Sequence, residues 1–161
     1  MKKIGLLIGL IGLLFFTAKA QELKEINGIY YADSVAYTGR FTTHFTNGKI
    51  KIELNIENGL KNGTANVYFE NGQLNEVRSY KNNLMHGSWI TYSDQKVLIG
   101  LANYKDGLKH GAWMIWDSSG NLLYELHYNM GEKVGIWRNF GKNGEIVSER
   151  EYPEKVKESG Q

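Results

Sequence analysis

The sequence contains no cysteine and one proline among its 161 residues. The absence of cysteine excludes disulfides, thiolate metal sites, a cysteine nucleophile and a lipid anchor on an N-terminal cysteine. One proline against 19 glycines indicates many tight turns joining regular strands. Aromatic residues make up 12% of the chain, with 10 tyrosines and 4 tryptophans, which also favours β-structure.

The first twenty residues have the organisation of a secretory signal peptide. Lys2 and Lys3 form a basic start, residues 4–16 are an uncharged apolar run, and Ala18-Lys19-Ala20 supplies the small residues that signal peptidase requires. An apolar run of this length is short for a membrane span, and an uncleaved anchor is the alternative. The sequence therefore predicts an exported protein, periplasmic or secreted, that is cleaved after Ala20.

No excess of positive charge survives this cleavage. The full chain has 19 basic and 17 acidic residues, and three of its lysines lie in residues 1–20. The mature chain keeps 16 basic and 17 acidic residues, a net charge of −1. This charge argues against nucleic-acid binding. Because no basic amphipathic helix is present, membrane-lipid binding has no support either.

Motifs of common enzymes are also missing. The sequence has no Gly-x-Ser-x-Gly, no Gly-x-Gly-x-x-Gly, no phosphate-binding loop and no His-Glu-x-x-His. His86 and His110 recur 24 residues apart, which in stacked hairpins is too far for shared metal coordination. Glu53, Glu125 and Glu149 share one repeat position, but nothing implies a cleft around them. We predict no enzymatic activity, no metal site and no cofactor.

A 24-residue repeat is the strongest feature of the sequence. Its five units cover residues 39–62, 63–86, 87–110, 111–134 and 135–158, and each begins with a glycine: Gly39, Gly63, Gly87, Gly111 and Gly135. Two residues later come Phe41, Ala65, Trp89, Trp113 and Trp137. Seventeen residues after each glycine come Ile56, Tyr80, Tyr104, Tyr128 and Tyr152. Such a period indicates an array in which each unit contacts only its neighbours.

Each unit has the pattern of a β-hairpin. In the third unit the strands are predicted over residues 88–92 and 97–104. The turn inside the other units is Asn-Gly or Ser-Gly, as in Asn47-Gly48, for which we predict a type I′ turn. Gln95-Lys96 takes this place in the third unit and predicts a turn of a different type. Turns between units, such as Asn58-Gly59, also carry residues that tolerate positive φ.

The predicted fold class is all-β: an elongated antiparallel β-hairpin repeat array forming a single open twisted sheet. Alternation over residues 122–128 gives one apolar and one mixed face, as expected for a sheet with one covered side. Residues 21–38 are expected to cap the array with two short strands, 26–31 and 35–37. The repeats fill residues 39–152. Residues 153–161 form a polar tail that we expect to fray, beginning with Pro153.

Two units carry the repeat motif most clearly, Gly87–Tyr92 and Gly111–Trp116, and Tyr104-Lys105-Asp106-Gly107 is a linking segment. These residues resemble the MORN-type repeat in its bacterial variant, over residues 39–152. Arrays of this variant with a signal peptide are similar to YwqK-type antitoxin components. The resemblance implies an elongated hairpin array whose motif residues are structural rather than catalytic.

The aromatic positions supply the candidate binding residues. Tryptophans are expected to form one row along the ribbon, and the tyrosines Tyr80, Tyr104, Tyr128 and Tyr152 another. Both rows suit a structural spine, and the alternative is a binding strip for a peptide or glycan. Tyr92 has the opposite parity to Trp89, so both faces are expected to carry aromatic side chains. The candidate partner-binding residues are Trp89, Trp113, Trp137, Tyr92 and Trp116.

These features predict a protein-interaction module outside the cytoplasm. Repeat ribbons offer long surfaces suited to macromolecules, and nothing in the sequence organises a small-molecule pocket. The expected partner is a protein, either toxin-like, as in an antitoxin or immunity pair, or a component of the envelope. The alternative function is an envelope- or glycan-binding surface protein that uses the tryptophan row.

Overall fold

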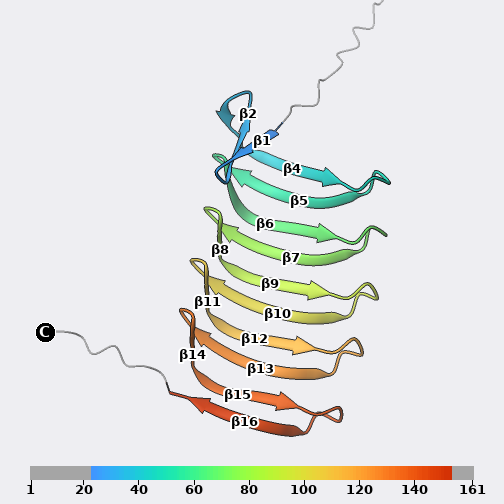
Figure 1. Ribbon diagram of the computed structural model, residues 1–161, viewed down its shortest axis with the longest axis vertical. Coiled ribbons are helices and arrows are strands. Elements are labelled where there is room, and N and C mark those ends of the chain that lie inside the picture. Colours follow the sequence, from blue (N-terminus) through green and yellow to red (C-terminus); the bar gives the residue numbers. More distant parts are fainter. Residues whose placement is uncertain (1–22, 154–161) are drawn as a thin grey trace, which may run out of the picture.

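Ten antiparallel strands follow one another across the main sheet in chain order (Figure 1). The computed structural model describes residues 23–153. Two strands come from each unit: β4 (Gly39–His44), β5 (Ile50–Glu57), β6 (Leu60–Tyr68), β7 (Leu74–Lys81), β9 (Gly87–Tyr92), β10 (Leu98–Lys105), β12 (Gly111–Trp116), β13 (Leu122–Asn129), β15 (Gly135–Phe140) and β16 (Ile146–Tyr152). The predicted all-β hairpin array, open at both edges of its sheet, is confirmed. The predicted signal peptide lies outside the described residues.

Turns inside the units are not type I′, so that prediction is wrong. In the first unit the Gly48 amide donates to the Phe45 carbonyl at 3.0 Å, and the Phe45 amide donates to the Lys49 carbonyl at 2.8 Å. Gly48 has a φ of 82°, whereas Asn47 keeps a negative φ. This is a three-residue hairpin loop whose last residue is left-handed. The Asn47 Oδ1 atom accepts the Lys49 amide at 3.0 Å, which stabilises the loop.

The corresponding turn of the third unit is of the same type, contrary to the sequence prediction. Its Lys96 amide donates to the Ser93 carbonyl at 3.0 Å, and the Ser93 amide donates to the Val97 carbonyl at 2.8 Å. Lys96 therefore takes the place of glycine with a φ of 65°. The number of loop residues and the sheet around them fix this conformation, although lysine does not favour it.

The turns between units have positive φ at both central residues, as predicted. Asn58 and Gly59, for example, have φ values of 51° and 80°, the type I′ conformation. After each of the next three turns a two-residue strand pairs back on the strand before it: β8 (Leu84–Met85), β11 (Leu108–Lys109) and β14 (Glu132–Lys133). Successive turns are also joined, because the Gly107 amide donates to the Met85 carbonyl at 2.8 Å and the Gly131 amide to the Lys109 carbonyl at 2.7 Å. The units are thus linked through their turns as well as through the sheet.

A separate three-stranded sheet lies at the N-terminal end of the array (Figure 1). It consists of β1 (Leu23–Ile26), β2 (Ile29–Ala32) and β3 (Val35–Ala36). The prediction of one strand over 26–31 is wrong, because Asn27-Gly28 forms a turn with positive φ at both residues. Hydrogen bonds join this sheet to the array: the Tyr30 amide donates to the Gly59 carbonyl at 2.8 Å, and Asn83 Nδ2 donates to the Gly28 carbonyl at 2.8 Å.

Tyr30 of β2 packs against an aromatic ring of the first unit. Its ring centroid lies 5.9 Å from that of Phe41, and its side chain is buried. Burial and a hydrogen bond with Glu25 raise the pKa of the Tyr30 hydroxyl to about 12. The small sheet thus adds an aromatic contact to the first unit.

Neither face of the main sheet is covered by a second layer in the described part of the chain, so the expected covered side is wrong. Only five apolar side chains there are buried, and most side chains of the sheet are half-buried: the five are Tyr30, Ala32, Ile56, Ala65 and Val134. The apolar face lacks a covering layer because its own large rings shield one another. The stability of the array therefore depends on contacts between neighbouring units.

Candidate interaction surfaces

Seven aromatic rings form a continuous row along one face of the sheet, and we call this row the spine. Tyrosines and tryptophans alternate, with ring centroids 5.0–5.9 Å apart and interplanar angles of 54–63°. Tilted and edge-to-face pairs of this kind contribute about 0.5–1.5 kcal/mol each beyond their buried area. In chain order the spine consists of Tyr80, Trp89, Tyr104, Trp113, Tyr128, Trp137 and Tyr152.

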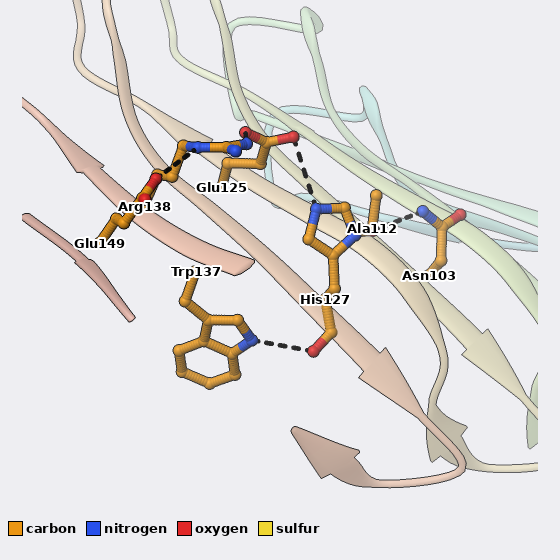
Figure 2. Close-up of polar contacts among 7 residues, drawn as sticks. All are labelled: Asn103, Ala112, Glu125, His127, Trp137, Arg138 and Glu149. Atoms are coloured by element: carbon orange, nitrogen blue, oxygen red, sulfur yellow. Dashed lines mark hydrogen bonds and ion pairs between the residues drawn. The ribbon is translucent and has the colours of Figure 1, made fainter. Parts of the chain in front are cut away.

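The indole N–H of each spine tryptophan bonds to the backbone of the preceding unit. Trp137 Nε1 donates to the His127 carbonyl at 2.9 Å, as Figure 2 shows. Trp113 Nε1 donates to the Asn103 carbonyl at the same distance, 2.9 Å. Trp89 Nε1 makes the same bond to Ser79 at 3.3 Å. The only hydrogen-bond donor of each of these tryptophan side chains is thereby paired with the backbone of the protein itself.

Cations lie over the spine rings. Lys109 Nζ lies 4.4 Å from the ring centroid of Trp113, and Lys133 Nζ lies 4.4 Å from that of Trp137. The Arg78 guanidinium takes a similar position 5.1 Å from the ring centroid of Trp89. Each predicted tryptophan thus has two tyrosine neighbours, a cation and a bonded indole N–H, an arrangement that joins units together. Partner binding by these three residues stays a prediction.

The opposite face, which we call the open face, carries a second row of side chains. Cross-strand partners place Val77 beside Ile90, Ile90 beside Leu101, and Leu101 beside Met114. Their side chains are half-buried although no described residue lies over them. These four residues, the central row, are an apolar strip that crosses four strands, roughly 14 Å at the usual strand spacing.

Tyr92 and Trp116 lie on the open face beside the central row. Side chains of β12 alternate, so Met114 and Trp116 share one face and Trp113 the other. Tyr68, at the same repeat position as Tyr92, confirms this side, because its hydroxyl donates to Glu53 of the open face. Neither the Trp116 indole N–H nor the Tyr92 hydroxyl bonds to a residue that the structure describes. These two residues differ from the spine in having free polar tips on half-buried rings.

A charged cluster borders the central row toward the C-terminus (Figure 2). Glu125 is the cross-strand partner of Met114, and it accepts a hydrogen bond from Arg138 Nη1 at 3.0 Å. Arg138 Nε donates to Glu149 at 3.2 Å, and His127 Nε2 lies 3.4 Å from Glu125. The two carboxylates raise the pKa of the Arg138 guanidinium through their hydrogen bonds. Row and cluster together give an apolar strip with an ionic border.

Polar groups border the central row at its other end. Asn66 is the cross-strand partner of Val77, and its Nδ2 donates to Glu53 at 3.3 Å. The Tyr68 hydroxyl donates to the same carboxylate at 2.6 Å. These hydrogen bonds, that of Tyr68 first, hold the pKa of the Glu53 carboxyl below its usual value. The apolar strip is thus limited at both ends by groups that are already paired.

The described residues show no constellation for metal chemistry. No group of three or more histidine, aspartate and glutamate side chains within residues 23–153 could hold a metal ion. His86 Nδ1 instead lies 3.1 Å from Asp106 Oδ1, and His110 Nδ1 accepts the Met130 amide at 3.4 Å. Both histidines therefore contact the next turn of the array. The described part of the chain also contains no helix that could cross a lipid bilayer.

Comparison with known families agrees with this architecture. The family model described as a MORN repeat variant matches residues 37–58, 61–82 and 109–130. This chain is a MORN-repeat protein. The matched segments fall on the first, second and fourth hairpins, and the other two MORN units follow from the unbroken period and the shared spine. No curated protein matches the chain.

The expectation of separate tryptophan and tyrosine rows is wrong, because the two residue types alternate in the single spine. The sequence analysis also missed the central row. Its residues stand three and fourteen positions after the first glycine of a MORN unit, and they are apolar only in the middle of the array. A comparison of these two positions across all five units would have shown that their residues are polar in the end units and apolar in the middle ones. The free polar tips of Tyr92 and Trp116 could not be read from the sequence, because the same residue types occupy the spine.

Proposed function

We propose that this protein is an exported, non-enzymatic MORN module that binds another protein through its open face. MORN repeats are commonly protein- or membrane-binding modules. The observation that supports this use of the open face is the central row together with Tyr92 and Trp116. It combines apolar side chains with two rings whose polar tips bond no described residue.

Interfaces of specific complexes have this composition. Aromatic residues, methionine and arginine are enriched at their centres, and charged groups lie at the rim. Here the central row and the two rings beside it, Tyr92 and Trp116, supply the apolar and aromatic groups, and Glu125 and Arg138 lie at the border. The spine supplies the rigid backing, because its rings and indole bonds hold consecutive units in register.

Two features of the sequence support a location for the protein and a class of partner. The signal-peptide pattern of residues 1–20 supports a location in the periplasm or outside the cell. The likeness to YwqK-type antitoxin components supports a toxin-like protein as the partner, in an antitoxin- or immunity-like pair. Binding requires no cofactor in this proposal.

Affinity capture with matched variants tests this function. The chain from Gln21 is immobilised and exposed to envelope and culture fractions of its own cells, and the bound proteins are identified by mass spectrometry. Trp116→Ala should lose the captured partner, because it removes a large open-face ring beside the central row. Tyr124→Ala should keep it, because Tyr124 is 41% exposed on the spine face.

Two outcomes contradict the proposal. Equal capture by both variants excludes the open face as the interface. Retention of envelope polysaccharide without any protein indicates a glycan-binding function instead, and loss of that retention in Trp137→Ala would assign it to the spine.

A further inference from the structure

The last strand, β16, has the same outward backbone groups as the internal strands β10 and β13. Each of those internal strands pairs with the tryptophan-bearing strand of the next unit. Inside the array the Asn103 carbonyl accepts two N–H groups: the amide of His110, the last residue of the same unit, at 2.9 Å, and the indole of Trp113 in the next unit at 2.9 Å. The His127 carbonyl accepts the Val134 amide at 3.1 Å and the Trp137 indole at 2.9 Å. This carbonyl therefore points out of its own unit toward the next one.

The last unit has the same geometry, but no described residue lies beyond it. Glu151 occupies the position of Asn103 and His127, and β16 is the final strand of the sheet. Because backbone groups alternate along a strand, the amide and carbonyl of Glu149 face the same open edge as the Glu151 carbonyl. Residues 154–161 contain no aromatic residue that could supply an indole.

The spine ends at this edge with a ring contacted on one side. Tyr128 packs against both Trp113 and Trp137, whereas Tyr152 packs against Trp137 alone, with ring centroids 5.0 Å apart. At the opposite end of β16, Ile146 and Val147 are 54% and 61% exposed. At the other end of the spine Tyr80 also packs against one ring, that of Trp89, but its strand β7 is paired on both sides, with β6 and β9.

We propose that β16 is a docking edge for an antiparallel strand of another protein that carries the pattern Gly-x-Trp followed by a basic residue. The tryptophan ring packs on Tyr152, and its indole N–H donates to the Glu151 carbonyl, as in the three internal copies. The basic residue faces Glu149, because at the preceding junction Arg138 faces Glu125 at 3.0 Å. This site uses the backbone edge of β16 and the end of the spine rather than the central row, and it shares only Glu149 with the charged cluster of the open face.

A second copy of this chain is not the occupant that the edge favours. Its own Gly-x-Trp strands, β9, β12 and β15, are paired on both sides. Its free edge strand β4 carries Phe41, which has no indole donor and already contacts Tyr30. Exposed charges at Glu149, Arg150 and Glu151 also disfavour indiscriminate strand pairing. The edge is thus selective for a complementary strand.

A synthetic peptide with the sequence of residues 133–142 tests the proposal, because it contains the natural Gly-x-Trp-Arg strand β15. Binding of the dye-labelled peptide to the purified protein is measured by fluorescence anisotropy. We expect saturable one-to-one binding that is at least about tenfold weaker for the peptide with alanine in place of Trp137. The protein variant Glu149→Pro, which removes an outward amide, should weaken binding at least as much.

Two control variants distinguish a loss of the binding edge from a general loss of folding. Thr42→Pro removes the corresponding outward amide from the opposite edge, β4, and should leave peptide binding unchanged. Glu149→Lys should reject the parent peptide and accept one with glutamate in place of Arg138. Equal binding of the alanine peptide, equal loss in Thr42→Pro, or no charge-swap effect would overturn the proposal. So would a dimer in sedimentation that Glu149→Pro dissociates, because a second copy would then occupy the edge.

Discussion

Trp113 donates its indole N–H to the Asn103 carbonyl while its ring lies between Tyr104 and Tyr128, with centroids 5.1 and 5.3 Å away. One side chain thus joins two consecutive MORN units by a hydrogen bond and by two ring contacts. The same arrangement at Trp89 and Trp137 makes the spine the principal connection between hairpins that have no covering layer.

Substitutions at Trp113 should therefore lower stability in two steps. Trp113→Phe loses the indole bond and should cost about 1–2 kcal/mol of unfolding free energy. Trp113→Ala also loses both ring contacts and should cost about 3 kcal/mol or more. Urea unfolding followed by circular dichroism measures both. Trp116→Ala is the matched control on the same strand and should cost less than half as much, because Trp116 bonds no described residue. Equal losses at the two positions would contradict the structural role of the spine.

Lys96 offers a stabilising substitution. It holds a φ of 65° where the other MORN units have glycine, and a left-handed non-glycine residue costs about 1–2 kcal/mol. Lys96→Gly should raise the free energy of unfolding by about 1 kcal/mol, whereas Lys96→Ala should give no gain because alanine shares the steric cost. Thermal and urea unfolding of the pair decide this. A gain in the alanine variant would point to the lysine charge rather than to the backbone.

Gly59 is where the N-terminal sheet meets the array. A Cβ atom built there would lie 2.6 Å from Ile29 Cγ2 and 3.1 Å from the Tyr30 carbonyl oxygen. Gly59→Ala should therefore displace the small sheet and expose Tyr30 in hydrogen exchange. Gly48→Ala is the control, because Gly48 has a similar φ of 82° but no atom within 4 Å of its Cβ position. It should cost only about 1 kcal/mol and leave Tyr30 protected. Equal exposure of Tyr30 in both variants would contradict this role of Gly59.

The polar border at Glu53 predicts a dependence of stability on pH. The pKa of Glu53 is lowered in the folded protein, chiefly by the hydrogen bond from Tyr68. This contribution is fully present above the ordinary carboxyl value of 4.5 and is lost as the pH falls through the lower folded value. Tyr68→Phe should make the loss of stability between pH 7 and pH 3 smaller. The measurement is the denaturant midpoint of the parent and the variant at pH 7 and at pH 3. If the midpoint falls equally in both proteins, other carboxylates dominate the pH dependence.

Features that depend on local residue patterns could be predicted from the sequence, whereas those that depend on contacts between distant residues could not. The glycines from Gly39 to Gly135 predicted the hairpins and their order, because local turn propensity and one period act together. The turn type was wrong because the hydrogen bond from Gly48 to Phe45 depends on loop length rather than on the Asn-Gly pair. The contact of Tyr30 with Phe41 lies outside the period, so no repeat position signalled it.

The candidate surfaces show the same division. Parity alone put Trp89 and Tyr92 on opposite faces. The two tryptophans of β12 differ in their hydrogen-bond partners: the Trp113 indole bonds to Asn103 of the preceding unit, whereas the Trp116 indole bonds no described residue. Because such a partner belongs to a neighbouring unit, the sequence of one unit does not reveal it. The central row also required the register of several strands, since Ile90 and Leu101 become neighbours only once β9 and β10 pair.

Binding of the captured partner to Met114→Glu and Ile115→Glu tests the central proposal most directly. The two residues are adjacent on β12 and receive the same charge, but Met114 lies on the open face and Ile115, 40% exposed, on the spine face. With both variants folded by circular dichroism, Met114→Glu should raise the dissociation constant about 100-fold, equivalent to about 2.7 kcal/mol, and Ile115→Glu should change it less than about threefold. A large effect at Ile115 with none at Met114 would place the partner on the spine face and contradict the account.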